Sequence, residues 1–480
     1  MNENNQTRKI HMDDILCFFI ILSPLLDMLS FWFRHTFQEA SVSPSTVLRP
    51  LIPIVILIIL FWKKPIKGKV LIGGLIYGLY AIIHLYIFQQ VKTESSYGGL
   101  TNELQYIVNY TFMILNLFIY WYVFRPKDSQ KIRFSVCIAL SIYIISIFLA
   151  ILTKTSSSTY IEGMGYKGWF ESGNSLCAIL CLCLCMVIPI VKERKINAIW
   201  IPIILLTGVF LTTLVGTRTG LLGFGLILVV YLMAELVVSI LKKNKINKKL
   251  MGAGIVVLLV SVVCVGIFGS KTLERRAHLH QIEANIQDEE TGETAHISGD
   301  LLKLKEQIEQ EALPESYMSK AAQQSILDLY QYAQEHQLAN NDMRMQQYIY
   351  NQNLVKNQKS WVLFLFGNGY KAQFRELVME MEIPAFLFNF GLLGFILYFG
   401  PFLALFAYFA YFGIRHIRQI DADYILLVFG LCLGFILSFM SGYTFFYASA
   451  SLLIVAMNVL LFQKVRQIEE KPKLEAGDGK

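Results

Sequence analysis

Charged side chains beside long apolar segments are the residues of this sequence best suited to chemistry. They are Asp27, Arg49, Arg218, Arg275, Arg276 and Glu382. A guanidinium group binds phosphate oxygens through paired hydrogen bonds, and a carboxylate can take a proton from a hydroxyl group. The set therefore predicts a phosphate-binding site with Glu382 as a candidate base.

Arg218 is the best candidate phosphate ligand. It stands alone among small residues in the tight turn GTRTG, directly before an apolar segment over 219–241. Backbone N–H groups at the start of a helix add to the attraction for an anion. The alternative is an arginine that extends to lipid headgroups, as long cationic side chains do at membrane surfaces.

Each of the other candidates also has a functional and a structural interpretation. Arg49 and Asp27 either belong to a site or pair to hold two helices together. Arg275 and Arg276 either bind an anion or anchor a helix end at the interface, and Glu382 either acts as a base or ends a loop.

The segment GWFESGN places aromatic rings beside hydrogen-bonding groups at Trp169, Glu171 and Asn174. Such a combination suits sugar rings, and interfacial anchoring is the alternative. His278 and His280 lack a third metal ligand, and no nucleotide-binding or Ser–His–Asp pattern is present. We expect no metal, no other cofactor and no nucleic-acid partner.

The elements that must position these residues are membrane helices. A span needs about 20 apolar residues, because lipid cannot satisfy an unpaired backbone. The sequence predicts an all-α polytopic fold with about twelve spans, over 15–33, 47–62, 70–88, 106–124, 134–153, 173–191, 198–216, 219–241, 250–269, 384–412, 424–441 and 446–462. Glycine pairs such as Gly74 with Gly78 and Gly430 with Gly434 predict close helix packing.

Basic residues predict the orientation. Both termini and alternate connections carry 25 of the 42 lysines and arginines, whereas the other short connections carry 6. By the positive-inside rule, both termini are cytoplasmic and the candidate site faces outward. We expect a bacterial cytoplasmic membrane protein with spans over 1–269, an extracytoplasmic loop domain over 270–383, spans over 384–463 and a cytoplasmic tail over 464–480.

The long loop is predicted to be mainly helical and to hold itself together by packing. Apolar residues recur at helical spacing at Leu301, Leu304 and Ile308, and again at Ile326, Leu329 and Tyr330. After Arg344 the loop becomes aromatic and is expected to return to the membrane surface, ending at Glu380 and Glu382.

This layout resembles the superfamily of O-antigen ligases and Wzy-type polysaccharide polymerases, which are bacterial membrane glycosyltransferases. The stretches that carry the resemblance are LVGTRTGLLGF, LFGNGY and EMEIPAFLFNFGLLGFIL, in this order around the late loop. The resemblance implies a metal-independent, inverting transfer of an undecaprenyl-diphosphate-linked glycan. It implies that Arg218, Arg275, Arg276 and Arg344 bind the diphosphate and that Glu382 is the base.

The acceptor distinguishes two activities within this superfamily. Lipopolysaccharide ligases carry a histidine at the loop end, where this chain has Glu380 and Glu382. We therefore expect a polymerase whose acceptor is another lipid-linked repeat unit, with Arg49, Asp27, Trp169, Glu171, Asn174 and Glu380 as glycan-binding or structural residues. Its expected partners are a chain-length regulator and a flippase. A ligase is the alternative, and a polysaccharide flippase or exporter is the alternative from another class.

Overall fold

The computed structural model describes most of the chain. The described residues are 11–37, 43–63, 68–90, 99–124, 129–160, 163–192, 200–245, 247–285, 300–315, 317–336, 338, 343–369, 377–440 and 444–477.

Apolar helices dominate the described residues and confirm the all-α polytopic fold. Eleven of them are long and apolar enough to cross a membrane. They are α1 (Met12–Thr36), α2 (Pro44–Lys63), α3 (Gly68–Gln90), α4 (Leu100–Val123), α5 (Ser129–Leu152), α6 (Gly173–Val187, continued by η2, Ile188–Lys192), α8 (Arg218–Leu241), α9 (Lys248–Phe268), the run of α15 (Glu382–Gly394), η6 (Phe395–Phe399) and α16 (Gly400–Arg415), α17 (Ala422–Met440) and α18 (Ala448–Gly477).

The predicted span over 198–216 is a shorter apolar helix. It consists of α7 (Trp200–Val209) and a π-helical end, η4 (Phe210–Leu214). The helix ends there because Gly216 takes the left-handed region, with φ of +79°, and Thr217 caps the start of α8. At the other end of the chain, the predicted tail over 464–480 begins within α18, which runs on to Gly477.

The helices differ in how much of their surface the protein covers. Helices α6 and α18 lie at the centre, and the described side chains over their apolar lengths are mostly buried. Helices α2, α3 and α9 lie at the edge, and few of their apolar side chains are buried. In water such exposure would be unfavourable, whereas in a bilayer these faces meet lipid.

The loop between α9 and α15 forms a second, separate hydrophobic core. It contains α10 (Lys271–Asn285), α11 (Asp300–Glu309), α12 (Lys320–Glu335), α13 (Met343–Gln358) and α14 (Trp361–Phe366). The six residues predicted to lie at helical spacing are all buried together: Leu301, Leu304, Ile308, Ile326, Leu329 and Tyr330. The part of the loop from α11 to α13 therefore packs as its own unit.

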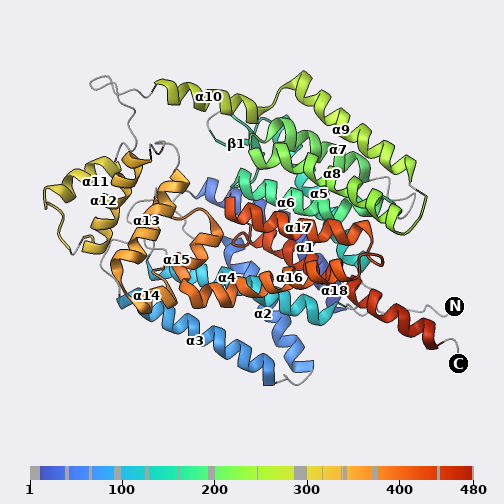
Figure 1. Cartoon of the computed structure of the whole chain (residues 1–480), viewed down its shortest axis with the longest axis horizontal. Coiled ribbons are helices and arrows are strands. Elements are labelled where there is room, and N and C mark those ends of the chain that lie inside the picture. The colour runs from blue at the N-terminus through green and yellow to red at the C-terminus, as the bar shows by residue number, and fades with distance from the viewer. Residues whose placement is uncertain are drawn as a thin grey trace.

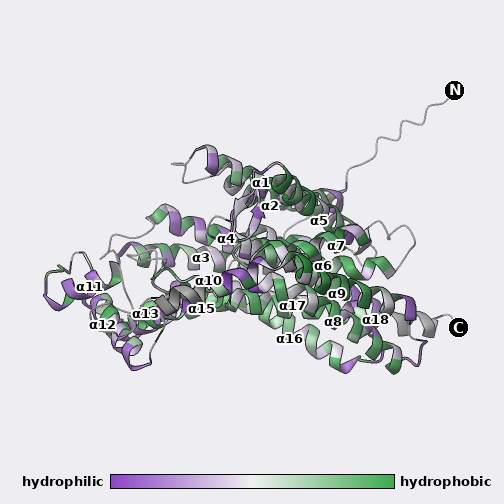
Figure 2. Ribbon diagram, turned by 90° about the horizontal axis from the view of Figure 1, so that it is seen from above, coloured by the Kyte–Doolittle hydropathy of each residue, from purple (hydrophilic) through white to green (hydrophobic). Residues whose placement is uncertain are grey.

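Figure 1 shows the loop helices α11 to α14 at one end of the molecule and the end of α18 at the other. We call these ends the loop side and the terminal side of the bundle. The hydropathy colouring in Figure 2 changes in the same direction, from hydrophilic loop helices to the hydrophobic bundle. On the loop side, the connection between α5 and α6 forms a small antiparallel hairpin of β1 (Ser157–Ser158) and β2 (Tyr166–Gly168).

The aromatic end of the loop returns to the bundle through two glycines. A side chain at Gly367 would meet the backbone of Asn389, and Gly391 approaches the Gly367 backbone with φ of +67°. The Asn368 and Gly369 amides donate to the Phe388 and Asn389 carbonyls, at 3.1 and 2.8 Å. This interlock puts a kink in α15 where α14 docks.

The two glycine pairs differ in whether another helix packs closely against them. Gly430 and Gly434 allow α17 to approach α6 and α18, as predicted. A side chain at Gly430 would begin only 3.0 Å from Met457 and 3.1 Å from Cys185, and one at Gly434 would contact Ile454 and Leu182. The prediction of close packing at Gly74 and Gly78 is wrong. Among the described residues, no other helix lies within 4 Å of the position of a side chain at either glycine, because α3 is at the edge of the bundle.

Candidate functional site

Three arginines from distant parts of the chain converge on the loop side, and we call Arg218, Arg275 and Arg344 the arginine cluster. Arg275, in the first turns of α10, stacks on the Tyr160 ring with 3.3 Å between its Cζ atom and the ring centroid. Burial lowers the pKa of Arg275, and the guanidinium groups of Arg218 and Arg344 lower it further. Arg218 and Arg344 are therefore both close enough to Arg275 to repel its charge.

The turn before α8 holds Arg218 in place. The Thr217 side chain accepts a hydrogen bond from the Gly220 amide at 3.0 Å, so that Arg218 becomes the first residue of the helix. Ser270 donates to the Thr212 carbonyl at 2.8 Å and Thr272 to the Thr217 carbonyl at 3.2 Å. These bonds join the start of α10 to the same turn and bring Arg275 beside Arg218.

Arg344 joins the cluster from α13. It donates to the Met440 carbonyl at 2.8 Å, and its Nε atom lies 3.5 Å from a Glu380 carboxylate oxygen. Within the described part of the chain, neither Arg218 nor Arg275 forms an ion pair with a carboxylate. Among the described residues, these three guanidinium groups are therefore paired with one carboxylate, which leaves an excess of positive charge. Such an excess attracts a polyvalent anion.

Glu382 occupies a different environment from that of Glu380. It is buried, and its two oxygens accept hydrogen bonds from the Phe445 and Phe446 amides at 2.8 and 2.6 Å. A carboxylate held in this way fixes the backbone directly before α18. Glu380, in contrast, is partly exposed beside Arg344.

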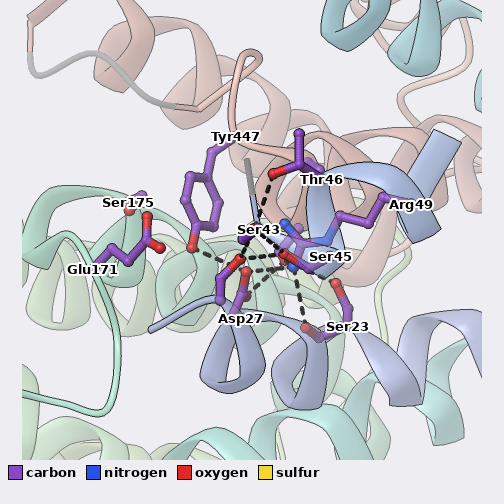
Figure 3. A network of polar contacts seen from close by, with 12 residues as sticks. Ser23, Asp27, Ser43, Ser45, Thr46, Arg49, Glu171, Ser175 and Tyr447 are labelled. Atoms are coloured by element: carbon purple, nitrogen blue, oxygen red, sulfur yellow. Dashed lines mark hydrogen bonds and ion pairs between the residues drawn. The ribbon is translucent and has the colours of Figure 1, made fainter. Parts of the chain in front are cut away.

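Asp27 and Arg49 form the pair that the sequence predicts, at the centre of a larger group that we call the aspartate network. The Arg49 guanidinium contacts an Asp27 oxygen at 2.5 Å. Tyr143, Tyr447 and Ser449 also donate to this carboxylate, at 2.5, 2.9 and 2.7 Å. Figure 3 shows Asp27 and Arg49 among the surrounding serines, with Tyr447 pointing at Asp27. Four donors from four helices or turns thus neutralise a buried carboxylate.

A cavity of about 220 Å³ opens next to this network, and we call it the polar pocket. Arg34 and Glu171 stand at its rim as an ion pair, at 3.0 Å. Burial raises the pKa of Glu171, although the Arg34 guanidinium opposes the rise. The lining residues are Ser30, Arg34, Ser45, Thr46, Arg49, Pro50, Gln105, Asn109, Phe112, Glu171, Ser172, Phe446, Tyr447 and Ala448.

The remaining predicted residues lie around these two regions. The Trp169 indole donates to Thr155 at 2.8 Å and contacts the Trp32 ring, which is half exposed near the end of α1. Asn174 lies in the first turn of α6, and Arg276 is exposed beside Arg275 on α10. Trp169 therefore has the surroundings of an interfacial anchor.

Sequence reasoning missed the residues that support these charges. Tyr160 lies under Arg275, and Tyr143, Tyr447 and Ser449 surround Asp27. Tyr143 lies in an apolar span and Tyr160 in a short connection, and neither position follows a pattern. Their roles arise from tertiary contacts between distant segments.

The comparison with known families decides the class of the protein. The family model described as O-antigen ligase like membrane protein matches residues 9–467. The chain belongs to the O-antigen ligase family. No curated protein matches the sequence.

Membership in the O-antigen ligase family makes the chain a multi-pass membrane protein that processes glycans. The family implies lipid-linked glycan substrates in the membrane. The arginine cluster and the polar pocket, both on the loop side, are the two places where the described residues offer charged and polar groups to such a substrate.

Proposed function

We propose that the protein is a polysaccharide polymerase of the outer face of the bacterial cytoplasmic membrane, with both termini in the cytoplasm. It transfers a glycan from undecaprenyl diphosphate to a hydroxyl group of another lipid-linked repeat unit. The observation that supports this proposal is the excess positive charge of the arginine cluster beside the partly exposed carboxylate of Glu380.

The cluster would stabilise the leaving group. As the acceptor oxygen bonds to the anomeric carbon, the bond from that carbon to the diphosphate oxygen breaks and negative charge develops on the lipid diphosphate. Fixed cations that meet this developing charge lower the barrier. Arg218, Arg275 and Arg344 are already held in place by the α7–α8 turn, by Tyr160 and by the Met440 carbonyl.

The two carboxylates at the loop end, Glu380 and Glu382, would have different roles in the reaction. The hydrogen bonds of Glu382 favour a positioning role, since both of its oxygens already accept backbone amides. Glu380 is the more accessible group, and in this proposal it accepts the proton of the attacking hydroxyl. A direct displacement of this kind inverts the anomeric centre and needs no metal.

The decisive test uses the purified protein in nanodiscs with a lipid-linked repeat unit. We expect a ladder of lengthened products without added nucleotide or metal. Arg218→Ala should abolish the ladder, because the diphosphate loses its cation at the start of α8, while Arg418→Ala on the terminal side should not change it.

The pattern of products separates the possible outcomes. One transfer to an acceptor other than a repeat unit would identify a ligase. Full elongation by the Arg218→Ala variant would remove the diphosphate role of the cluster, and translocation of the lipid-linked unit without any transfer would indicate a flippase.

A further inference from the structure

The polar pocket beside the aspartate network has no role in the proposed transfer, and its walls come from five parts of the chain. They are the end of α1, the start of α2, one face of α4, the connection before α6 and the residues around the start of α18. On α4 the lining residues are Gln105, Asn109 and Phe112, which share one face because they are spaced by about one helical turn. Segments distant in the sequence thus converge on a single cavity.

Three polar groups of this pocket have no hydrogen-bond partner within the described part of the chain. The Gln105 and Asn109 amides, one turn apart on α4, are partly buried and bond to no other described residue. The Oε1 atom of Glu171 is buried without a partner, whereas its Oε2 atom pairs with Arg34 at 3.0 Å. Buried polar atoms in proteins normally form hydrogen bonds. The pocket therefore favours an occupant that both donates and accepts hydrogen bonds.

The charged groups of the pocket are paired with carboxylates of the protein. Arg49 pairs with Asp27, and Arg34 pairs with Glu171. An anionic ligand would have to compete with a carboxylate for either guanidinium group. The polar pocket therefore differs from the arginine cluster, and it favours a ligand without charge.

Aromatic rings complete the walls, and two buried carboxylates hold them in place. The Phe446 amide donates to Glu382 at 2.6 Å, and the Tyr447 hydroxyl donates to Asp27 at 2.9 Å. Sites for small molecules combine apolar and aromatic walls with a few fixed polar groups. A saccharide fits this combination, because its C–H groups can pack on the rings while its hydroxyl groups bond to amides and a carboxylate.

The size of the pocket suits one sugar ring. Its volume of about 220 Å³ is below the ~300–1,000 Å³ of sites for drug-sized ligands. The Arg34 side chain at the rim is about half exposed, so the pocket opens to the outside there. The rest of a glycan can extend through this opening.

We propose that the polar pocket binds one neutral sugar ring of the glycan substrate and so selects which glycan is processed. The Gln105 and Asn109 amides and the Glu171 carboxylate bond to its hydroxyl groups, and Phe446 and Tyr447 pack against it. The ring belongs to a part of the glycan away from the diphosphate, which stays outside this pocket. In taking the ring from the protein's own substrate the inference rests on the proposed function, whereas the binding of a free saccharide does not.

The test is the binding of free saccharides to the full chain in nanodiscs, measured by saturation-transfer difference NMR with empty nanodiscs as the blank. The neutral probes are the methyl glycosides of glucose, galactose, mannose, rhamnose and N-acetylglucosamine. The charged probe is methyl glucuronide, which differs from the glucoside by its carboxylate. We expect at least one neutral probe to bind and the glucuronide to bind more weakly than the glucoside.

Asn109→Leu removes an amide from the pocket at nearly constant size. We expect the affinity for the bound neutral probe to decrease by about 10-fold, because a sugar hydroxyl then loses its partner. Gln105→Leu should act in the same direction. Asn353→Leu on α13 is the matched control, since Asn353 is also partly buried and lies outside the pocket. Thermal unfolding in detergent verifies that each variant is folded.

Three outcomes would overturn the site: no neutral probe above the blank, equal affinity of the Asn109→Leu and Asn353→Leu variants, or a glucuronide that binds as well as the glucoside. Arg218→Ala should keep the binding, because Arg218 lies outside the pocket. Saccharide binding by a wild type that does not elongate lipid-linked units would retain the pocket and remove the proposed function. Elongation without saccharide binding would retain the proposed function and remove the pocket.

Discussion

The arginine cluster contacts the end of α17 at Met440 and the aspartate network contacts the start of α18 at Tyr447 and Ser449, and the two groups differ in how their charges are paired. In the network, Asp27 is almost completely buried and four side chains donate to it. In the cluster, three guanidinium groups face one carboxylate and Arg218 is exposed. A charge that is neutralised within the protein stabilises the fold, whereas a charge left in excess is available to a ligand. The difference predicts that mutations in the two regions separate stability from activity.

Asp27→Ala should have the largest effect, and on stability. Removing one partner of a buried ion pair typically costs about 3–5 kcal/mol, because the other charge is left buried and unpaired. We expect a lower unfolding temperature in detergent, measured by fluorescence-detected size exclusion. The double variant Asp27→Ala with Arg49→Met should recover part of the loss. A double variant no more stable than the single one would show that Arg49 does not depend on Asp27.

Arg275→Ala should instead reduce the rate of transfer with little change in stability. Loss of one group that stabilises developing charge typically lowers kcat by about 10²–10³-fold. Single-turnover kinetics with a lipid-linked donor would measure this. Arg276→Ala, which changes the exposed neighbour on α10, is the matched control. Equal losses in the two variants would place both arginines in the cluster.

Substitutions of the two loop-end carboxylates should also have different effects, one on the transfer rate and the other on stability. Glu380→Gln removes the proposed base, and the transfer rate should decrease by about 10²-fold or more. Glu382→Gln weakens the hold on the Phe445 and Phe446 amides, so we expect mainly a lower unfolding temperature. Glu315→Gln, in an exposed pair with Lys320, controls for loss of charge in the loop. If Glu382→Gln alone abolished transfer in a stable protein, the roles would be reversed.

Tyr160→Leu should have the smallest effect. A cation over an aromatic ring contributes roughly 0.5–2 kcal/mol, so the KM for the donor should increase several-fold as Arg275 loses its support. Tyr160→Phe keeps the ring and should behave like the wild type. A change in kcat with constant KM would mean that the ring acts in the transition state only.

The sequence predicts the membrane helices well because two local constraints determine them. The side chains must be apolar, and every backbone N–H and C=O group in lipid must be hydrogen-bonded within the segment. The loop is also predicted well, since Leu301 and Ile326 are buried at the predicted spacing. The Asp27–Arg49 pair is predictable because a charge inside an apolar segment needs a partner. The aromatic supports are not, since Tyr447 meets Asp27 across 420 residues.

Gly74 and Gly78 show a second limit of sequence patterns. Two small residues four positions apart mark a helix face without bulk, but the pattern does not say what occupies that face. At Gly430 and Gly434 it is another helix, and at Gly74 and Gly78 it is an open groove. The difference is the position of the helix in the bundle, which depends on the whole chain.

The junction between α9 and α10 would separate the proposed reaction from changes in the thickness of the bilayer. Few side chains of helix α9 are buried inside the protein, so its tilt can adjust to the thickness of the membrane. Gly269, with φ of +71°, directly follows it. Beyond this glycine, Ser270 and Thr272 bond to the turn that carries Arg218. Helix α9 can therefore lean as the bilayer thins or thickens while Arg275 keeps its place, so turnover should vary little between membranes of different lipid length.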